Sequence, residues 1–227
     1  MSALAAREGY RLWAPTYDAE NAVSQLETAL VGEMTRPPGG LRLLDAGCGT
    51  GRRLRDCGAA VATGVDLSPE MIAAGRDDLD PAIRLLVGDV RALPFPDGGF
   101  DLVWCRLVIG HLPECTRAYA ELGRVTVPGG QVIVTDFHPA AHAAGHRRTF
   151  RRGDAVHEVE HHVHELEAHR EAARAAGLRL AEVREAEIGP SIRLYYERAG
   201  RIASYDADRG LPVVLALSFV KDGGCGS

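Results

Sequence analysis

The sequence predicts a doubly wound α/β fold around a seven-stranded, mostly parallel sheet, and three observations carry this prediction. Short apolar segments alternate with segments of helical spacing from residue 41 to residue 136. The first apolar segment, Leu41 to Leu44, ends in Asp45 and three alternate glycines. A strand that ends in such a loop seats a nucleotide-like cofactor in this fold class. Strands separated by helices imply parallel pairing with right-handed crossovers.

The chain before the sheet contains an aromatic opening and one amphipathic helix. Residues 3–9 predict a short helical turn, and three aromatic residues follow it: Tyr10, Trp13 and Tyr17. Apolar side chains then recur at helical spacing and predict a helix over 20–34. The run Pro37-Pro38-Gly39-Gly40 ends this helix and leads into the first strand.

The remaining elements alternate until the pattern weakens in the last third of the chain. We expect strands over 41–45, 61–66, 83–88, 100–105, 131–136, 178–184 and 213–220. We expect helices over 51–58, 69–77, 113–125 and 163–176. Ser68 and Pro69 make a good helix start, and Gly177 fits a C-terminal cap. Residues 137–162 show no clear period, and the polar stretch 189–212 is predicted to lie over the site as a lid.

Length and composition predict one domain over residues 1–227. Residues 1–40 form the N-terminal lid and helices, 41–136 the cofactor-binding core, 137–212 the acceptor-side segment and lid, and 213–227 the last strand and tail. The net charge of −5, without a dominant basic block, argues against nucleic acid as a partner. No apolar run approaches the roughly 18 residues of a membrane span.

The cysteines and the N-terminus predict the compartment. The five cysteines are odd in number and form no C-x-x-C pair, which argues against a zinc site or a disulfide framework. The apolar run at the N-terminus is too short for a signal peptide. We therefore expect a cytoplasmic protein, and we leave open whether it forms a homodimer.

Acidic residues follow the predicted strands, at the edge of the sheet where this fold class binds ligands. They are Asp45, Asp66, Asp89 and Asp136. Such acids often only cap turns and helix starts. Asp66 is the stronger candidate, because it lies 19 residues beyond Gly47, about where a doubly wound protein uses an acid to hold ribose hydroxyls.

The glycine spacing favours a cofactor without phosphates. A dinucleotide fingerprint, G-x-G-x-x-G, would place its third glycine at position 52, where this chain has arginine; glycine falls at Gly51 instead. Asp45, just before the glycines, would repel a pyrophosphate but suits a cation. S-adenosylmethionine, which carries a ribose, a sulfonium and an ammonium, meets this description.

Five motifs follow one another along the chain, at residues 43–51, 65–71, 88–95, 100–103 and 128–130. Together they resemble the class I S-adenosylmethionine-dependent methyltransferases, small-molecule type, similar to the ubiquinone/menaquinone-biosynthesis methyltransferases. Tyr10, Trp13, Tyr17 and Asp18 resemble the aromatic opening of this subgroup. The resemblance implies a Rossmann-like sheet whose last strand is antiparallel.

The resemblance also implies positions for the cofactor S-adenosylmethionine and its product S-adenosylhomocysteine. Gly47, Gly49 and Gly51 would line the methionine moiety, with Asp45 near its ammonium group. Asp66 would accept from the ribose hydroxyls, while Leu67 and Met71 flank the adenine. Asp89 would accept from the adenine amino group, with Val90 beside it. Cys105 and Arg106 would lie under the methionine part, although the family has a small polar residue where this chain has Arg106. Tyr10 and Tyr17 would close the N-terminal lid or, alternatively, only pack as core aromatics.

Histidines and arginines beyond residue 136 are the candidates for the acceptor side. A base matters only if the acceptor must lose a proton, and His138 and His164 are the first candidates for that base or for orienting groups. His111 is more often structural in the resembled family. Several histidines keep helical spacing, but we predict no metal site. The run Arg147, Arg148, Arg151 and Arg152 either binds a carboxylate or phosphate of the acceptor or forms a solvated charge run.

The sequence thus predicts an S-adenosylmethionine-dependent methyltransferase that acts on a small organic acceptor, quinone-like or from specialised metabolism, by in-line displacement. Two alternatives stay open. One is a non-catalytic S-adenosylmethionine-binding module, and the other is an NAD(P)-dependent Rossmann oxidoreductase.

Overall fold

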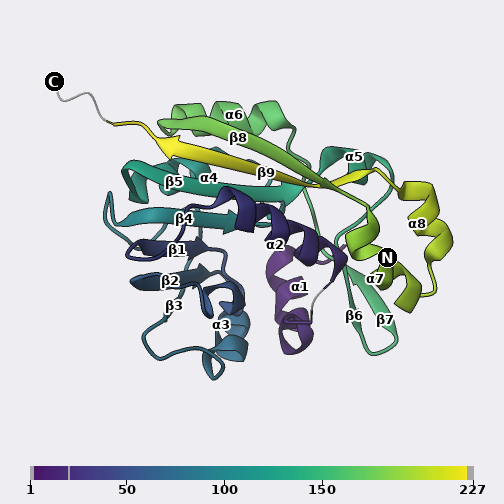
Figure 1. The fold of residues 1–227 in the computed structure, drawn as a ribbon. Helices are drawn as coiled ribbons and strands as arrows, with labels where there is room; N and C mark the ends of the chain where they lie inside the picture. The colour runs from purple at the N-terminus through teal and green to yellow at the C-terminus, as the bar shows by residue number, and fades with distance from the viewer. Residues whose placement is uncertain (1–2, 20, 224–227) are drawn as a thin grey trace.

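Seven strands form the central sheet of the computed structural model, which describes residues 3–19 and 21–223, in the order β3-β2-β1-β4-β5-β9-β8 (Figure 1). Their bounds are β1 Arg42–Ala46, β2 Val61–Asp66, β3 Arg84–Val87, β4 Phe100–Arg106, β5 Thr126–Phe137, β8 Leu178–Glu187 and β9 Pro212–Lys221. Strands β3, β2, β1, β4 and β5 pair in parallel, and β9 pairs antiparallel with β5 and β8. The predicted Rossmann-like sheet with an antiparallel last strand is confirmed.

The helices cover both faces of the sheet. They are α1 Ala6–Trp13, α2 Ala22–Met34, α3 Pro69–Arg76, α4 Thr116–Val125, α5 Pro139–Ala143, α6 Leu166–Ala175, α7 Arg193–Arg198 and α8 Ile202–Asp208. Residue 20, where we expected the second helix to begin, and the tail 224–227 with Cys225 lie outside the described residues. None of the helices in the described part of the chain is long and apolar enough to cross a membrane.

The helix predicted over 51–58 is wrong. The structure has only one 3-10 turn there, η2 Arg52–Leu54. Leu54 is the only one of its residues that is buried, so the segment has no apolar face that packing could hold as a helix. Asp56 and Gly58 then take the left-handed conformation, with φ of 57° and 73°, and return the chain to β2. No full helix therefore begins at the glycine loop.

Two segments without a sequence pattern contain short elements. Residues 137–162 hold α5 and a hairpin of β6 Thr149–Arg152 and β7 Ala155–Glu158, and the stretch 189–212 holds α7 and α8. Phe150 is the only fully buried residue of the two hairpin strands, so neither strand shows a clear alternation. These elements are positioned by tertiary contacts, which is why periodicity did not predict them.

The core lies in two layers, one on each face of the sheet. The first layer packs α4 and α6 against the sheet, with Tyr119 and Leu122 fully buried. The second packs α2 and α3 against the other face, around Leu43 and Ile133. A smaller cluster of Trp13, Phe150 and Val159 joins α1 to the β6–β7 hairpin. In Figure 1, α1, α5, α7, α8 and this hairpin gather at the end of the sheet toward which β1 and β4 point.

Candidate functional site

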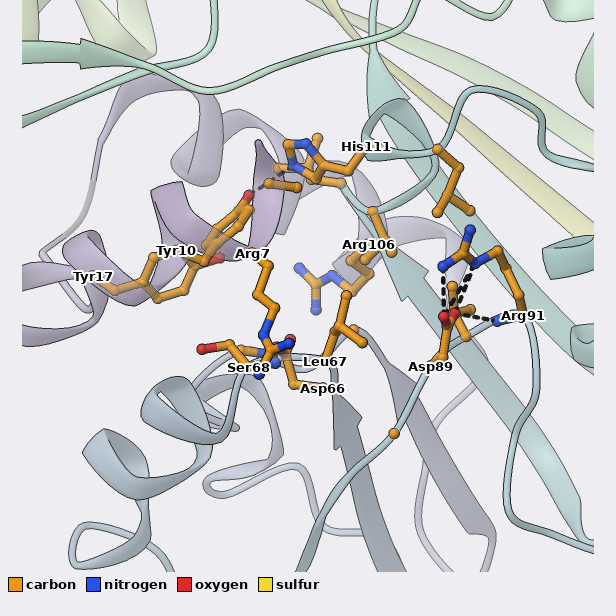
Figure 2. A pocket seen from close by; sticks show the side chains of 18 residues that line it. Arg7, Tyr10, Tyr17, Asp66, Leu67, Ser68, Asp89, Arg91, Arg106 and His111 are labelled. Carbon is orange, nitrogen blue, oxygen red and sulfur yellow. Dashed lines mark hydrogen bonds and ion pairs between the residues drawn. The ribbon is translucent and has the colours of Figure 1, made fainter. Parts of the chain in front are cut away.

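A cleft of about 840 Å³, open mouth included, lies at the carboxyl ends of β1, β2, β3 and β4, beside α1 (Figure 2). Nine of the predicted cofactor residues line it: Tyr10, Tyr17, Gly47, Gly49, Asp66, Leu67, Asp89, Val90 and Arg106. Sequence reasoning missed Arg7, which Figure 2 shows extending from α1 into the cleft.

The glycine loop forms the floor of the cleft beneath α1. Gly47 and Gly49 have φ of 84° and 61°, which a residue with a side chain rarely adopts. A Cβ atom on Gly47 would collide with Val108, and one on Gly49 would lie 3.1 Å from the ring of Tyr17. Gly51 does not line the cleft, because it packs against Leu79 and Leu85. Two of the three predicted glycines therefore face the ligand space.

Asp66, at the end of β2, is held by the glycine loop. Its Oδ2 accepts from the Gly49 N–H at 2.8 Å, and its Oδ1 accepts from the Ser68 N–H at 2.9 Å. Burial raises the pKa of this carboxyl, and the backbone donors oppose the rise. Each oxygen keeps a further lone pair, so the fixed carboxylate can also accept from a pair of ligand hydroxyls.

The predicted adenine side of the cleft has an apolar wall and one paired acid. Leu67 is 46% exposed and Val90 borders the cleft, whereas Met71 is buried beneath the loop and does not line it. Asp89 accepts from the Arg91 side chain, with Arg91 Nη2 at 2.6 Å from Oδ2 (Figure 2). The hydrogen bond to Arg91 lowers the pKa of Asp89. A ligand amino group would share this carboxylate with Arg91.

Asp45 is fully buried below the loop and does not line the cleft. Neither carboxylate oxygen has a hydrogen-bond partner among the described residues. Burial raises its pKa to about 6, and Arg53 and Arg106 oppose this rise. An unpaired buried carboxyl beside a ligand cleft fits a cationic group better than a phosphate.

Arg106, at the end of β4, is anchored by a buried acid that the sequence analysis missed. Arg106 Nε and Nη2 each donate to a carboxylate oxygen of Glu27 at 2.7 Å, and Arg53 Nη2 donates to the same carboxylate at 3.2 Å. Cys105, by contrast, is buried within β4 and does not line the cleft. One signal could have found Glu27: in α2 it falls between Val23 and Leu30 at helical spacing, on the apolar face.

Leu107, the next residue, turns the chain at the cleft in the left-handed conformation, with φ of 58°. Its N–H donates to the carbonyl of Thr135 at 2.9 Å and to Thr135 Oγ1 at 3.0 Å. A non-glycine residue in this conformation is uncommon, and such strain occurs at functional sites. The strain directs residues 106–112 along the cleft.

Tyr10 and His111 form the side of the cleft opposite Asp66. His111 Nδ1 lies 3.1 Å from the carbonyl oxygen of Glu160, which can only accept, so Nδ1 carries the proton of the neutral ring. His111 Nε2 therefore accepts from the Tyr10 hydroxyl at 2.8 Å. Burial, with Arg148 nearby, lowers the pKa of His111 to about 4. At neutral pH the pair is a neutral, oriented hydrogen-bonded unit and His111 is a weak base.

The state of His111 can be measured by its NMR titration. We expect the imidazole to stay neutral until the pH falls to about 4, whereas the unfolded chain takes up this proton near 6.5. Because the pKa of His111 is lower in the folded than in the unfolded chain, the neutral imidazole contributes to the free energy of unfolding. This contribution is fully present above pH 6.5 and is lost as the pH falls toward 4. The His111→Asn variant assigns the resonance and should lack this part of the pH dependence. A midpoint at or above 6.5 would contradict the prediction.

Neither predicted acceptor-side histidine lies at the cleft. His138 caps α5, where its Nδ1 accepts from the Ala140 N–H at 3.1 Å, and its Nε2 lies 3.3 Å from Glu185. His164 is buried beside α6, with Nε2 at 2.9 Å from the carbonyl of Leu112. Both are held by local contacts away from the cleft, and their role on the acceptor side stays a prediction. Tyr10 and His111 line the cleft.

Asp136, at the end of β5, is buried between two histidines. His161 Nε2 and His169 Nε2 each lie 3.5 Å from its carboxylate. Burial would raise the pKa of Asp136, but the two histidines lower it well below its usual range. The ring of His161 lies edge-on to that of His111, 5.9 Å between centroids, so this cluster supports the cleft from behind. Within the described residues, no group of three or more His, Cys, Asp or Glu side chains could hold a metal ion.

Comparison with known proteins agrees with this geometry. Residues 44–134 match the family model of a methyltransferase domain. A malonyl-[acyl-carrier protein] O-methyltransferase of Erwinia pyrifoliae is 44% identical over 104 residues, which are 44% of this chain and 39% of that protein. A demethylmenaquinone methyltransferase of Renibacterium salmoninarum is 36% identical over 135 residues, 56% of each chain. The matched part is thus 39% of the first relative and 56% of the second.

A solved structure shows the same fold over most of the chain. The S-adenosylmethionine-dependent methyltransferase from Mesorhizobium loti is 23% identical, with a TM-score of 0.65 over 86% of this chain and 97% of that one. Its likeness concerns the fold, and the family match concerns the segment that holds the glycine loop, Asp66 and Asp89. Over residues 44–134 this chain is therefore similar to the methyltransferase-domain family, and it shares the Rossmann-like fold of that solved methyltransferase.

Proposed function

We propose that this protein is an S-adenosylmethionine-dependent methyltransferase that transfers a methyl group to a small organic acceptor. The observation that carries the proposal is the fixed carboxylate of Asp66 beside the Gly47–Gly49 loop. It would accept from the two ribose hydroxyls of the cofactor. The names of two relatives, a malonyl-[acyl-carrier protein] O-methyltransferase and a demethylmenaquinone methyltransferase, support a small organic acceptor, quinone-like or from specialised metabolism.

The cleft fits this cofactor in three respects. Gly47 and Gly49 bring loop backbone without side chains to the edge of the cleft. Asp45 is an unpaired buried carboxyl, which favours a cationic ligand. Leu67 and Val90 offer an apolar wall for a base. When bound, S-adenosylmethionine supplies a methyl group on a sulfonium, which is a good leaving group.

The contribution of the protein itself is alignment. Tyr10 and His111 fix one wall of the cleft, and Arg106 is held in place by Glu27 beneath it. Rigid placement of a nucleophile against the methyl group can provide much of the rate acceleration of an in-line displacement. His111, with its pKa of about 4, is suited to orient Tyr10 rather than to remove a proton from a weak acid at neutral pH.

The alternatives predict different ligands. A dinucleotide-binding oxidoreductase places its pyrophosphate at a helix N-terminus after the glycine loop. This chain has only the turn η2 there, above the unpaired Asp45. A non-catalytic binding module would bind the cofactor but transfer no methyl group. Transfer of labelled methyl from S-adenosylmethionine to candidate acceptors separates this alternative from the enzyme.

The substitution Asp66→Ala tests the cofactor assignment. It removes the acceptor of the ribose hydroxyls, and charged hydrogen bonds of this kind are worth about 1.5–3 kcal/mol each, so we expect affinity for S-adenosylhomocysteine to fall by roughly 10- to 100-fold. Calorimetric titration measures it, with NAD(H) as the competing ligand. Asp80→Ala is the matched control, because Asp80 also accepts from a backbone N–H, that of Ala82, but lies outside the cleft. Unchanged affinity in Asp66→Ala would refute the assignment.

A further inference from the structure

A second cavity lies beside the cofactor cleft. Its empty volume is about 1310 Å³, open mouth included. Three stretches that are far apart in the sequence contribute side chains to it, within residues 13–23, 137–151 and 195–201. Its apolar lining is largely aromatic, from Trp13, Phe137, Phe150, Tyr195 and Tyr196. Such a lining suits an aromatic or otherwise apolar ligand.

The two cavities are joined by shared residues. A narrow third cavity lies between them. It shares Tyr17 and Leu107 with the cofactor cleft, and Trp13 and Arg148 with the second cavity. Tyr10 lines the cofactor cleft and stacks on Trp13, which lines the second cavity, with 5.7 Å between ring centroids, so two stacked rings separate the two spaces at this point. A ligand in the second cavity would thus lie next to the cofactor site.

The second cavity is strongly basic, although the chain carries a net charge of −5. Four arginines line it, Arg147, Arg148, Arg151 and Arg201, and none of its described lining residues is an Asp or Glu. Among the described residues, only Arg147 of these four has an acid within 4.0 Å. A cavity lined by one sign of charge concentrates ligands of the opposite sign.

Arg148 is the buried member of this group. It is 9% exposed, and within the described chain its guanidinium makes one hydrogen bond, from Nη2 to the Tyr10 hydroxyl at 3.3 Å. It lies over Trp13, with Cζ 5.9 Å from the ring centroid. An arginine stays charged in proteins, and a buried charge without a counter-ion is costly. The buried Arg148 guanidinium is therefore stabilised only when an anion or several water molecules accept hydrogen bonds from its remaining N–H groups.

We propose that the second cavity binds the acceptor and that Arg148 pairs with a carboxylate on it, so that the substrate is an aromatic or apolar carboxylic acid. This inference rests on the proposed methyltransferase function and specifies its substrate class. A guanidinium binds a carboxylate through two parallel hydrogen bonds. A carboxylate is favoured over a phosphate monoester, because one buried guanidinium balances one negative charge. A phosphate monoester carries about 1.5 to 2 negative charges at pH 7.

Calorimetric titration with a matched set of ligands tests the proposal. The set is 2-naphthoate, 2-naphthamide and 2-naphthyl phosphate, each titrated into the full chain saturated with S-adenosylhomocysteine. We expect the acid to bind at least about tenfold more tightly than the amide, the value of one charged hydrogen-bond pair. Equal affinities, no binding of the acid, or tighter binding of the phosphate would each overturn the proposal.

Variants locate the effect. Arg148→Met should reduce the ratio of the affinities for the acid and the amide to about one. Arg152→Met, four residues further along the chain at the end of β6 and outside the cavity, should leave this ratio unchanged. If the methionine variant does not fold, Arg148→Lys is the second test, because lysine keeps the positive charge. It should lower the ratio of the affinities for the acid and the amide severalfold, because lysine cannot form two parallel hydrogen bonds to a carboxylate. An unchanged ratio in either folded Arg148 variant would overturn the assignment. Failure of the wild type to bind S-adenosylhomocysteine would instead refute the proposed function.

Discussion

Replacing Glu27 by Gln should lower the free energy of unfolding by about 3–5 kcal/mol, the cost of breaking a buried ion pair by removing one partner. Glu27 is completely buried and receives hydrogen bonds from Arg106, Arg53 and Thr135. The variant leaves both guanidinium groups buried without their shared counter-charge. Urea unfolding monitored by circular dichroism measures the change.

The pH dependence of this loss is part of the expectation. Burial alone would raise the pKa of Glu27, but Arg53 and Arg106 together lower it to about 2. Because the pKa of Glu27 is lower in the folded than in the unfolded chain, its carboxylate stabilises the fold above pH 4.5, the pKa of the unfolded chain. This stabilisation is lost as the pH falls toward 2. The difference in the free energy of unfolding between wild type and Glu27→Gln should therefore be largest at pH 7 and should decrease below pH 4.5.

Glu33→Gln is the matched control in the same helix. Glu33 pairs with Arg184, but its side chain is 65% exposed, so the loss should be within about 1 kcal/mol. Equal losses in the two variants would mean that the Glu27 network is not the buried anchor described here. Because Arg106 lines the cofactor cleft, Glu27→Gln should also weaken S-adenosylhomocysteine binding, and Glu33→Gln should not.

The cofactor half of the site was predictable because its residues are close in sequence. Gly47, Gly49 and Asp66 lie within one strand–loop–strand unit, and the loop places the Gly49 N–H on the Asp66 carboxylate directly. Strand bounds follow from local apolar patterns, and β2 matches its predicted range, Val61–Asp66. Such features depend on short stretches of chain, which sequence patterns describe well.

The opposite wall was less predictable because it joins distant segments. Tyr10 meets His111 across 101 residues, and the ring of Trp13 stacks on Phe150 at 5.1 Å. No local spacing encodes these contacts. His138 and His164 were chosen from their order after β5, yet the direction of a side chain depends on packing, and both point to other surfaces. The buried charge of Glu27 was overlooked for the same reason: its partners come from η2, β4 and β5.

Asp45→Asn should raise the stability of the ligand-free protein, in contrast to Glu27→Gln, and should still weaken ligand binding at the cofactor cleft. The carboxyl of Asp45 is buried without a hydrogen-bond partner among the described residues, and burial raises its pKa from 3.8 to about 6. A raised carboxyl pKa means that the folded protein loses stability as the pH rises from about 4 to about 6, on the order of 3 kcal/mol. The neutral amide avoids this loss, so the ligand-free variant should be more stable than wild type above pH 6, by up to that amount.

The same variant should bind the cofactor product less tightly, because it lacks the negative charge proposed to attract the ammonium group. Thermal unfolding from pH 4 to pH 8, with and without S-adenosylhomocysteine, measures both effects: the variant should gain stability alone and lose part of the ligand-induced increase in Tm. Asp101→Asn is the control with opposite sign, because Arg42 lowers the pKa of Asp101 to about 2. If ligand-free Asp45→Asn is less stable than wild type at pH 8, the charge of Asp45 is not unpaired as described. If S-adenosylhomocysteine raises Tm equally in both proteins, Asp45 does not attract the ammonium group of the cofactor.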